Sequence, residues 1–110
     1  MNLSQLKTAL LSVLPGAVYH DRALEPPEKY IVWAADEQRS SLWADDKMIA
    51  QVLGGTVDYF TLDEYDANFE AIQAALNAAE IDFKLMSIQY EEETGITHYE
   101  WRWGLQTWHA

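Results

Sequence analysis

The residues that could do chemistry in this sequence are few and scattered. Histidine occurs at His20, His98 and His109. No two of them have the spacing of a helical metal-binding pair, and no carboxylate motif joins them. His98, Glu100 and Arg102 occupy alternate positions, which predicts that their side chains share the solvent-exposed face of a strand. We therefore predict no metal site and no cofactor.

Aspartates offer the next candidates. Asp45 and Asp46 are adjacent, whereas two-carboxylate catalysis needs neighbouring groups whose pKa values are separated by their surroundings. A solvated turn is the favoured interpretation of this pair. Asp58 lies among apolar residues in a strand-like segment. We expect it to pair with Lys84 or Arg102 across a sheet, or to face water, and assign it no catalytic role.

Motifs for covalent or phosphate chemistry are missing. The chain has no cysteine, which excludes disulfides, thiolate nucleophiles and cysteine-based zinc sites. No serine lies in a nucleophile-elbow pattern, and no glycine-rich phosphate loop is present. Gly54-Gly55 is too short for such a loop and predicts a bulge, a bend or a close backbone approach within a strand. The sequence thus favours a structural or interaction protein over an enzyme.

Length and charge narrow the class further. The 110 residues predict a single domain over positions 1–110. A formal net charge of −11 argues against direct binding to nucleic acid or to an anionic membrane. The sequence has no apolar run long enough to span a bilayer, and its start lacks the pattern of a signal peptide. We expect a protein of the cytoplasm, or of a particle assembled there.

Two amphipathic segments predict helices. Over residues 3–14, leucines and a valine recur at helical spacing, and Pro15-Gly16 ends the pattern. Residues 63–79 give the stronger pattern, with an acidic first turn and many alanines. Asp63 or Thr61 is the expected N-cap of this second helix.

Strand patterns fill most of the remaining chain. We expect a short edge strand and then longer strands separated by polar turns, the last two forming a hairpin: 17–20, 29–35, 48–61, 81–90 and 96–103. The polar stretches 36–40 and 45–47 predict turns, and 105–110 predicts a loose tail or a segment that docks on another subunit. The order implies an α+β fold, with an antiparallel, meandering sheet of about four to five strands and two helices packed on one side.

Alternation predicts which side chains share a face of the final hairpin. Thr97, Tyr99, Trp101 and Trp103 should lie on one face of its second strand. In the first strand, the alternation predicts one face with three apolar side chains and the opposite face with four others. The first set is Ile81, Phe83 and Leu85, and the second is Lys84, Met86, Ile88 and Tyr90.

Aromatic residues are the most unusual feature of the composition. Five tryptophans in 110 residues are hard to bury completely in a small domain, because each indole N–H needs a partner. Tryptophan and tyrosine are enriched at protein interfaces. The side chains that we expect at a subunit interface are Tyr30, Trp33, Trp43, Trp101 and Trp103.

Several stretches resemble small proteins encoded in prophages of Gram-positive bacteria. The resemblance covers about residues 26–103 and rests on the motifs PEKYIVW, SLWADD, TVDYFT, IQYEEETG and YEW, which begin at residues 27, 41, 56, 88 and 99. These proteins look like the neck and tail-completion components of long-tailed phages, including head–tail joining and tail-terminator proteins.

That resemblance implies an α+β protomer that closes into a homo-oligomeric ring, often a hexamer, at the head-proximal end of a phage tail. Its partners would be the tail tube and the head connector, and its location would be the virion, assembled in the cytoplasm of the bacterial host. The resemblance carries no catalytic residue. It leaves open whether the chain is a terminator or a joining protein.

Two other classes of function stay open. The net charge would suit a small acidic inhibitor, such as a DNA mimic or an immunity-type protein. The scatter of the carboxylates along the chain weakens this alternative. An enzyme or small-ligand binder would have to use Asp45, Asp58 or His98 together with aromatic residues, and no nucleophile–base pairing supports it.

Overall fold

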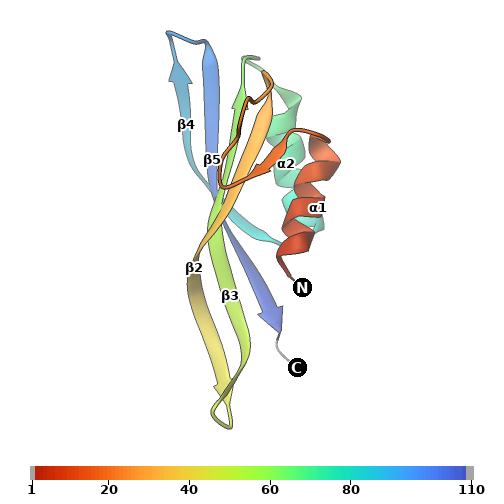
Figure 1. Ribbon diagram of the computed structural model, residues 1–110, viewed down its shortest axis with the longest axis vertical. Coiled ribbons are helices and arrows are strands. Elements are labelled where there is room, and N and C mark those ends of the chain that lie inside the picture. Colours follow the sequence, from red (N-terminus) through yellow and green to blue (C-terminus); the bar gives the residue numbers. More distant parts are fainter. Residues whose placement is uncertain (1, 109–110) are drawn as a thin grey trace.

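The computed structural model describes residues 2–108 and has the predicted α+β class. The sheet order is β1-β2-β3-β5-β4, with β1 parallel to β2 and the other pairs antiparallel. Figure 1 shows a long, twisted sheet with both helices against one side of its wider end. The elements in chain order are α1 (Leu3–Val13), β1 (Val18–His20), β2 (Tyr30–Ala44), β3 (Lys47–Thr61), α2 (Ala67–Ala78), β4 (Asp82–Glu91) and β5 (Ile96–Trp108).

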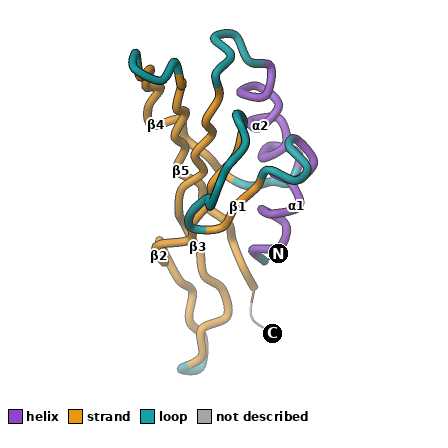
Figure 2. The backbone as a smooth tube through the Cα atoms, turned by 45° about the horizontal axis from the view of Figure 1, so that its top comes forward, coloured by secondary structure: helices purple, strands orange, loops and turns teal. Residues whose placement is uncertain are grey.

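The core lies between the two helices and the sheet face that they cover (Figure 2). Leu6 and Leu10 of α1 and Ile72 and Leu76 of α2 are fully buried there. The sheet contributes alternate residues of its central strands, as the period of two requires. These buried residues are Ile31, Trp33, Val57, Tyr59, Tyr99, Trp101, Trp103 and Leu105. No helix among residues 2–108 is both long and apolar enough to cross a membrane.

The start of α1 follows its sequence signals closely. The Asn2 side chain accepts a hydrogen bond from the backbone N–H of Ser4 at 2.9 Å, and the Gln5 side chain accepts one from the backbone N–H of Asn2. This reciprocal capping satisfies backbone donors that the first turn cannot use. Gly16, just beyond the helix, has a φ of +83°, a conformation that favours glycine.

The predicted turn over residues 36–40 is wrong, because β2 continues through it. Its pairing with β3 shifts register between Ala35 and Glu37 and again between Gln38 and Ser40. These irregularities bend the strand without ending it. From Ala35 to Ala44 the residues are exposed, so polar side chains here can extend a strand of which neither face is covered.

The second helix begins later than predicted. Asp66, and not Asp63 or Thr61, is the N-cap, and its side chain accepts a hydrogen bond from the backbone N–H of Asn68 at 2.8 Å. Thr61 instead accepts one from the backbone N–H of Asp63 at 3.1 Å. The acidic residues at 63 and 64 therefore belong to a short connection that precedes the helix.

The end of the chain is also more ordered than predicted. β5 extends through Trp108 and pairs with β3, with Leu105 opposite Leu53 and Trp108 opposite Ala50. Leu105 is only 1% exposed. Residues 105–108 are therefore part of the sheet, and residues 109 and 110 lie outside the described part.

A bulge in β4 shows that part of the predicted assignment of side chains to the two sheet faces is wrong. Leu85 lies opposite Trp101, but the register then shifts, so that Ile88 lies opposite Tyr99 and Tyr90 opposite Thr97. Directly opposed residues share a face. Ile88 and Tyr90 therefore lie on the helix side of the sheet with Leu85, and not on the opposite face as strict alternation predicts.

Candidate interaction surface

The β2–β3 hairpin carries a long projection, here called the arm and defined as residues 37–50. Figure 1 shows it extending from the body at the lower end of the sheet, and it gives the molecule an extent of 55 Å against 24 and 22 Å in the other directions. Residues 37–47 are all exposed. Its outer end is only two strands wide, because the described part of β5 ends at Trp108, opposite Ala50. A two-stranded hairpin is only marginally stable in water, so this end of the arm gains from contact with another surface.

The tip of the arm has the geometry of a tight hairpin turn. Asp45 and Asp46 have φ values of +51° and +62°, as the two central residues of a type I′ turn require. Aspartate tolerates this conformation better than most residues do. The prediction of a solvated turn here is confirmed.

Glycines make room for close contacts where the arm joins the body of the sheet. Gly54 lies opposite Gly104 of β5, and the Arg39 side chain lies over both, where their Cβ atoms would otherwise be. Gly55 is more constrained, because a Cβ there would stand 1.8 Å from the backbone oxygen of Ala34. The predicted close backbone approach at Gly54-Gly55 is therefore present at Gly55.

Exposed apolar side chains gather at both ends of the long axis. On the arm, Leu42 and Trp43 are 52% and 61% exposed. At the opposite end, Leu62, Ile88 and Tyr90 are also exposed, and we call them the distal patch. Leu62 and Tyr90 line one surface hollow of about 520 Å³. Exposed apolar groups concentrated in this way mark candidate contact surfaces.

The residues predicted at an interface fall in different places. Trp101 and Trp103 are fully buried, and their indole N–H groups donate to the Gln73 side chain at 3.1 Å and to the Thr56 carbonyl at 3.0 Å. Trp33 is 6% exposed. All three indoles are thus core groups of the protomer.

The other two predicted interface residues retain access to solvent. Tyr30 is partly buried and stacks on Phe60 with ring centroids 4.7 Å apart, and burial raises the pKa of its hydroxyl. Trp43 exposes most of its side chain at the end of the arm. Trp43 is therefore the best-placed contact residue of the predicted set.

On the sheet face without helices, polar residues from distant parts of the sequence lie close together. His98 Nε2 lies 2.7 Å from Asp58 Oδ1, so the expected partners Lys84 and Arg102 were wrong for this aspartate. Arg102 instead donates to both carboxylate oxygens of Asp36 at 2.9 Å and forms an ion pair with Glu37. These hydrogen bonds raise the pKa of Arg102 above its ordinary value.

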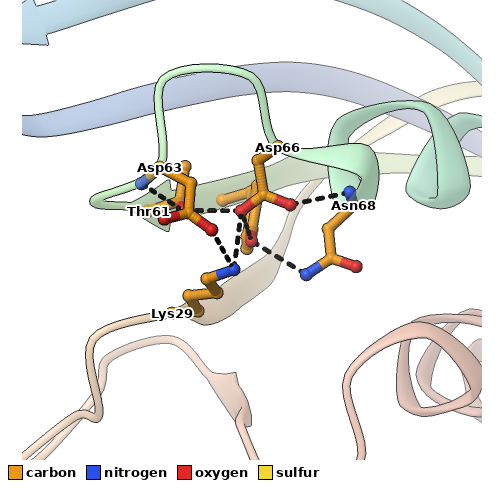
Figure 3. Close-up of polar contacts among 6 residues, drawn as sticks. Lys29, Thr61, Asp63, Asp66 and Asn68 are labelled. Carbon is orange, nitrogen blue, oxygen red and sulfur yellow. Dashed lines mark hydrogen bonds and ion pairs between the residues drawn. The ribbon is translucent and has the colours of Figure 1, made fainter.

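Another polar cluster joins the end of β3 to the start of α2 (Figure 3). The Asp66 carboxylate accepts hydrogen bonds from the hydroxyls of Tyr59 and Thr61, each at 2.6 Å, and Lys29 lies 3.5 Å away. Burial alone would raise the pKa of Asp66. The hydroxyls, the Asn68 backbone N–H and Lys29 outweigh burial and lower that pKa.

The Asp66 cluster is structural, and it gives a stability prediction. Asp66→Asn should lower the free energy of unfolding by about 2 kcal/mol, because a side chain that is 4% exposed loses charge-assisted hydrogen bonds. Asp63→Asn is the matched control, since Asp63 is 58% exposed. Urea unfolding of both variants measures the difference.

The same pair of variants gives the pH dependence. Because folding lowers the pKa of Asp66, its contribution should be fully present above the unfolded pKa of about 4 and should be lost as pH falls through the folded value. The difference in the free energy of unfolding between the wild-type chain and Asp66→Asn should therefore be constant near neutral pH and shrink in acid. A gap that widens in acid would contradict this assignment.

Comparison with known proteins gives a likeness of fold. No protein-family model matches the sequence, and a search of curated proteins found no match. Among solved structures, a chain from the virion of a native gene transfer agent particle is similar over 94% of this chain and 90% of that chain. The TM-score is 0.58 and the sequence identity is 14%, so the similarity concerns the fold.

Proposed function

We propose that this chain is a structural subunit of a phage-like particle, namely a tail-completion or head–tail joining protein that closes into a ring. The observation that carries the proposal is the shared fold, which extends over nearly the whole of both chains, with a particle protein as the similar structure. The exposed arm adds support, because a projection with an apolar end needs a partner. Neither observation calls for an enzymatic role.

The positions of the two apolar surfaces favour a head-to-tail contact. The arm and the distal patch lie at opposite ends of the long axis, so they cannot meet within one protomer (Figure 1). If the arm of one copy contacts a different surface on the next, the interface is heterologous, and such interfaces generate rings when the rotation closes. Leu42 and Trp43 would be the anchors of this contact.

The charge of the chain fits a ring around a DNA passage. A net charge of −11 on each protomer would give the assembly a strongly negative field. A lumen lined by carboxylates would repel phosphates and limit adhesion of a passing genome. The ring would contact the tail tube on one side and the head connector on the other.

The mass in solution tests the proposal. Light scattering behind a sizing column, over a range of protein concentrations, should show a closed multiple of the 12.6 kDa protomer, with a hexamer as the expected species. The closed species should gain population with concentration and then stop growing, because a ring has no free end. Unlimited growth would contradict closure.

A strict monomer at the highest concentration would contradict a ring that forms from this chain alone. The net charge would then favour an acidic inhibitor. A pull-down from host lysate that returns a basic nuclease or DNA-binding protein in a one-to-one complex would support that second function.

A further inference from the structure

We propose that the helix-free face of the sheet holds a binding site for one divalent transition-metal ion, with Zn²⁺ as the best-fitting ion. The ligands are Asp58 of β3 and His98 and Glu100 of β5. One ligand atom from each lies within 4.8 Å of the other two. One imidazole nitrogen and two carboxylate oxygens form a donor set that zinc accepts in proteins. This site does not depend on the proposed assembly.

The register of the sheet creates the site. Asp58 lies directly opposite Glu100, and Phe60 lies directly opposite His98. Like charges that face each other across two strands are destabilising, so the Asp58–Glu100 pair needs a compensating cation. His98 reaches Asp58 at 2.7 Å, whereas the Glu100 side chain makes no hydrogen bond or ion pair with any residue in the described range 2–108.

Neighbouring cations do not fill this role. Arg102 is the next residue on the same face of β5, but its guanidinium is held by Asp36 and Glu37 at 2.9 Å. Lys84 lies opposite Arg102, and it has no ion pair within the described part of the chain. The two opposed carboxylates are thus left with a single imidazole, and a divalent ion would neutralise both.

The ligands are held firmly and remain accessible. His98 stacks on Phe60 with centroids 4.3 Å apart and an angle of 15° between the rings, which fixes the direction of the imidazole. Asp58 and His98 have side chains 20% and 25% exposed, so an ion can reach them from solvent. Ligands on two paired strands are more rigid than ligands on loops.

Only a small adjustment is needed to coordinate an ion. Tetrahedral zinc places its ligand atoms about 3.4 Å apart, given bond lengths of about 2.0–2.2 Å. The Asp58–His98 contact would lengthen to this value, and the Glu100 carboxylate would turn inward. Three protein ligands leave a fourth position for water.

Calorimetric titration of zinc chloride into the untagged full chain, freed of metal by a chelator, tests the site. We expect one Zn²⁺ per chain, with affinity reduced at least about tenfold in His98→Gln and in Glu100→Gln. The matched control is His20→Gln, because His20 also lies near an aspartate, with Nε2 3.5 Å from Asp21. Within residues 2–108 it belongs to no cluster of three potential ligands. Its affinity should equal that of the wild-type chain.

Thermal unfolding separates a lost site from a lost fold. In chelator, Glu100→Gln should melt at or above the wild-type temperature, because it removes a like-charge pair. With Zn²⁺ present, the wild-type melting temperature should rise, and that of Glu100→Gln should rise less. Absence of zinc binding up to about 1 mM, or binding that both variants leave unchanged, would overturn the proposal.

Discussion

Gly55→Ala is expected to lower the free energy of unfolding by at least about 3 kcal/mol, a large share of the stability of a small domain. A Cβ at this position would lie 1.8 Å from the Ala34 oxygen and 2.8 Å from the Ala34 carbonyl carbon. Both are backbone atoms of β2, so no side-chain rotation can relieve the clash. The strand that carries Ile31 and Trp33 into the core would have to shift.

Gly54→Ala is the matched control for this prediction. Its added Cβ would meet the Arg39 and Glu37 side chains, with the closest approach 2.6 Å to Arg39 Cδ. These side chains are exposed and can move, so we expect a loss of about 1 kcal/mol or less. Denaturant unfolding should place the two variants well apart. Equal losses would mean that the bulge in β2 absorbs the extra methyl group.

The sequence predicts those parts of the fold in which one face is buried. Residues 3–14 and the hairpin 81–103 show clear periodicity, because every third or fourth residue of a helix and every second residue of a strand faces the core. Trp101 and Trp103 alternate with Glu100 and Arg102, and the structure places both indoles in the core. This alternation already indicates that the two indoles lie on the buried face of the strand.

The arm was missed for the same physical reason. Between residues 37 and 47 neither face of the hairpin is covered, so the sequence lacks the period of two that marks a strand. Its polar residues then resemble a turn. The short apolar stretch Leu42-Trp43-Ala44 lies between Ser40-Ser41 and Asp45-Asp46, and these polar residues on both sides are consistent with an exposed indole.

The candidate metal cluster could not be predicted from spacing along the chain. Asp58 and His98 are 40 residues apart, and they meet through the register between β3 and β5. Sequence patterns identify strands, but they do not fix which strands are neighbours or how they align. The bulge at Leu85–Ser87 shows the same limit, since it moves Ile88 and Tyr90 to the other face.

Trp43→Ala is expected to weaken self-association by about 2–4 kcal/mol per contact, the range of an interface anchor. The side chain is 61% exposed in the protomer, and its N–H donates to the Ser41 hydroxyl at 3.0 Å within the same strand. Burial of this indole against a neighbouring copy would remove a large apolar surface from water. Sizing with light scattering should show the ring dissociating at higher protein concentration than the wild-type ring does.

The stability of the protomer distinguishes an anchor from a core residue. Because Trp43 contacts no part of the core, Trp43→Ala should leave the free energy of unfolding of the dissociated chain within about 0.5 kcal/mol of the wild-type value. Trp43→Phe should retain part of the association, since the ring still fills the contact. Gln38→Ala, an exposed polar change on the same arm, should leave assembly intact. Equal losses of assembly and protomer stability in Trp43→Ala would instead assign the indole to holding the arm together.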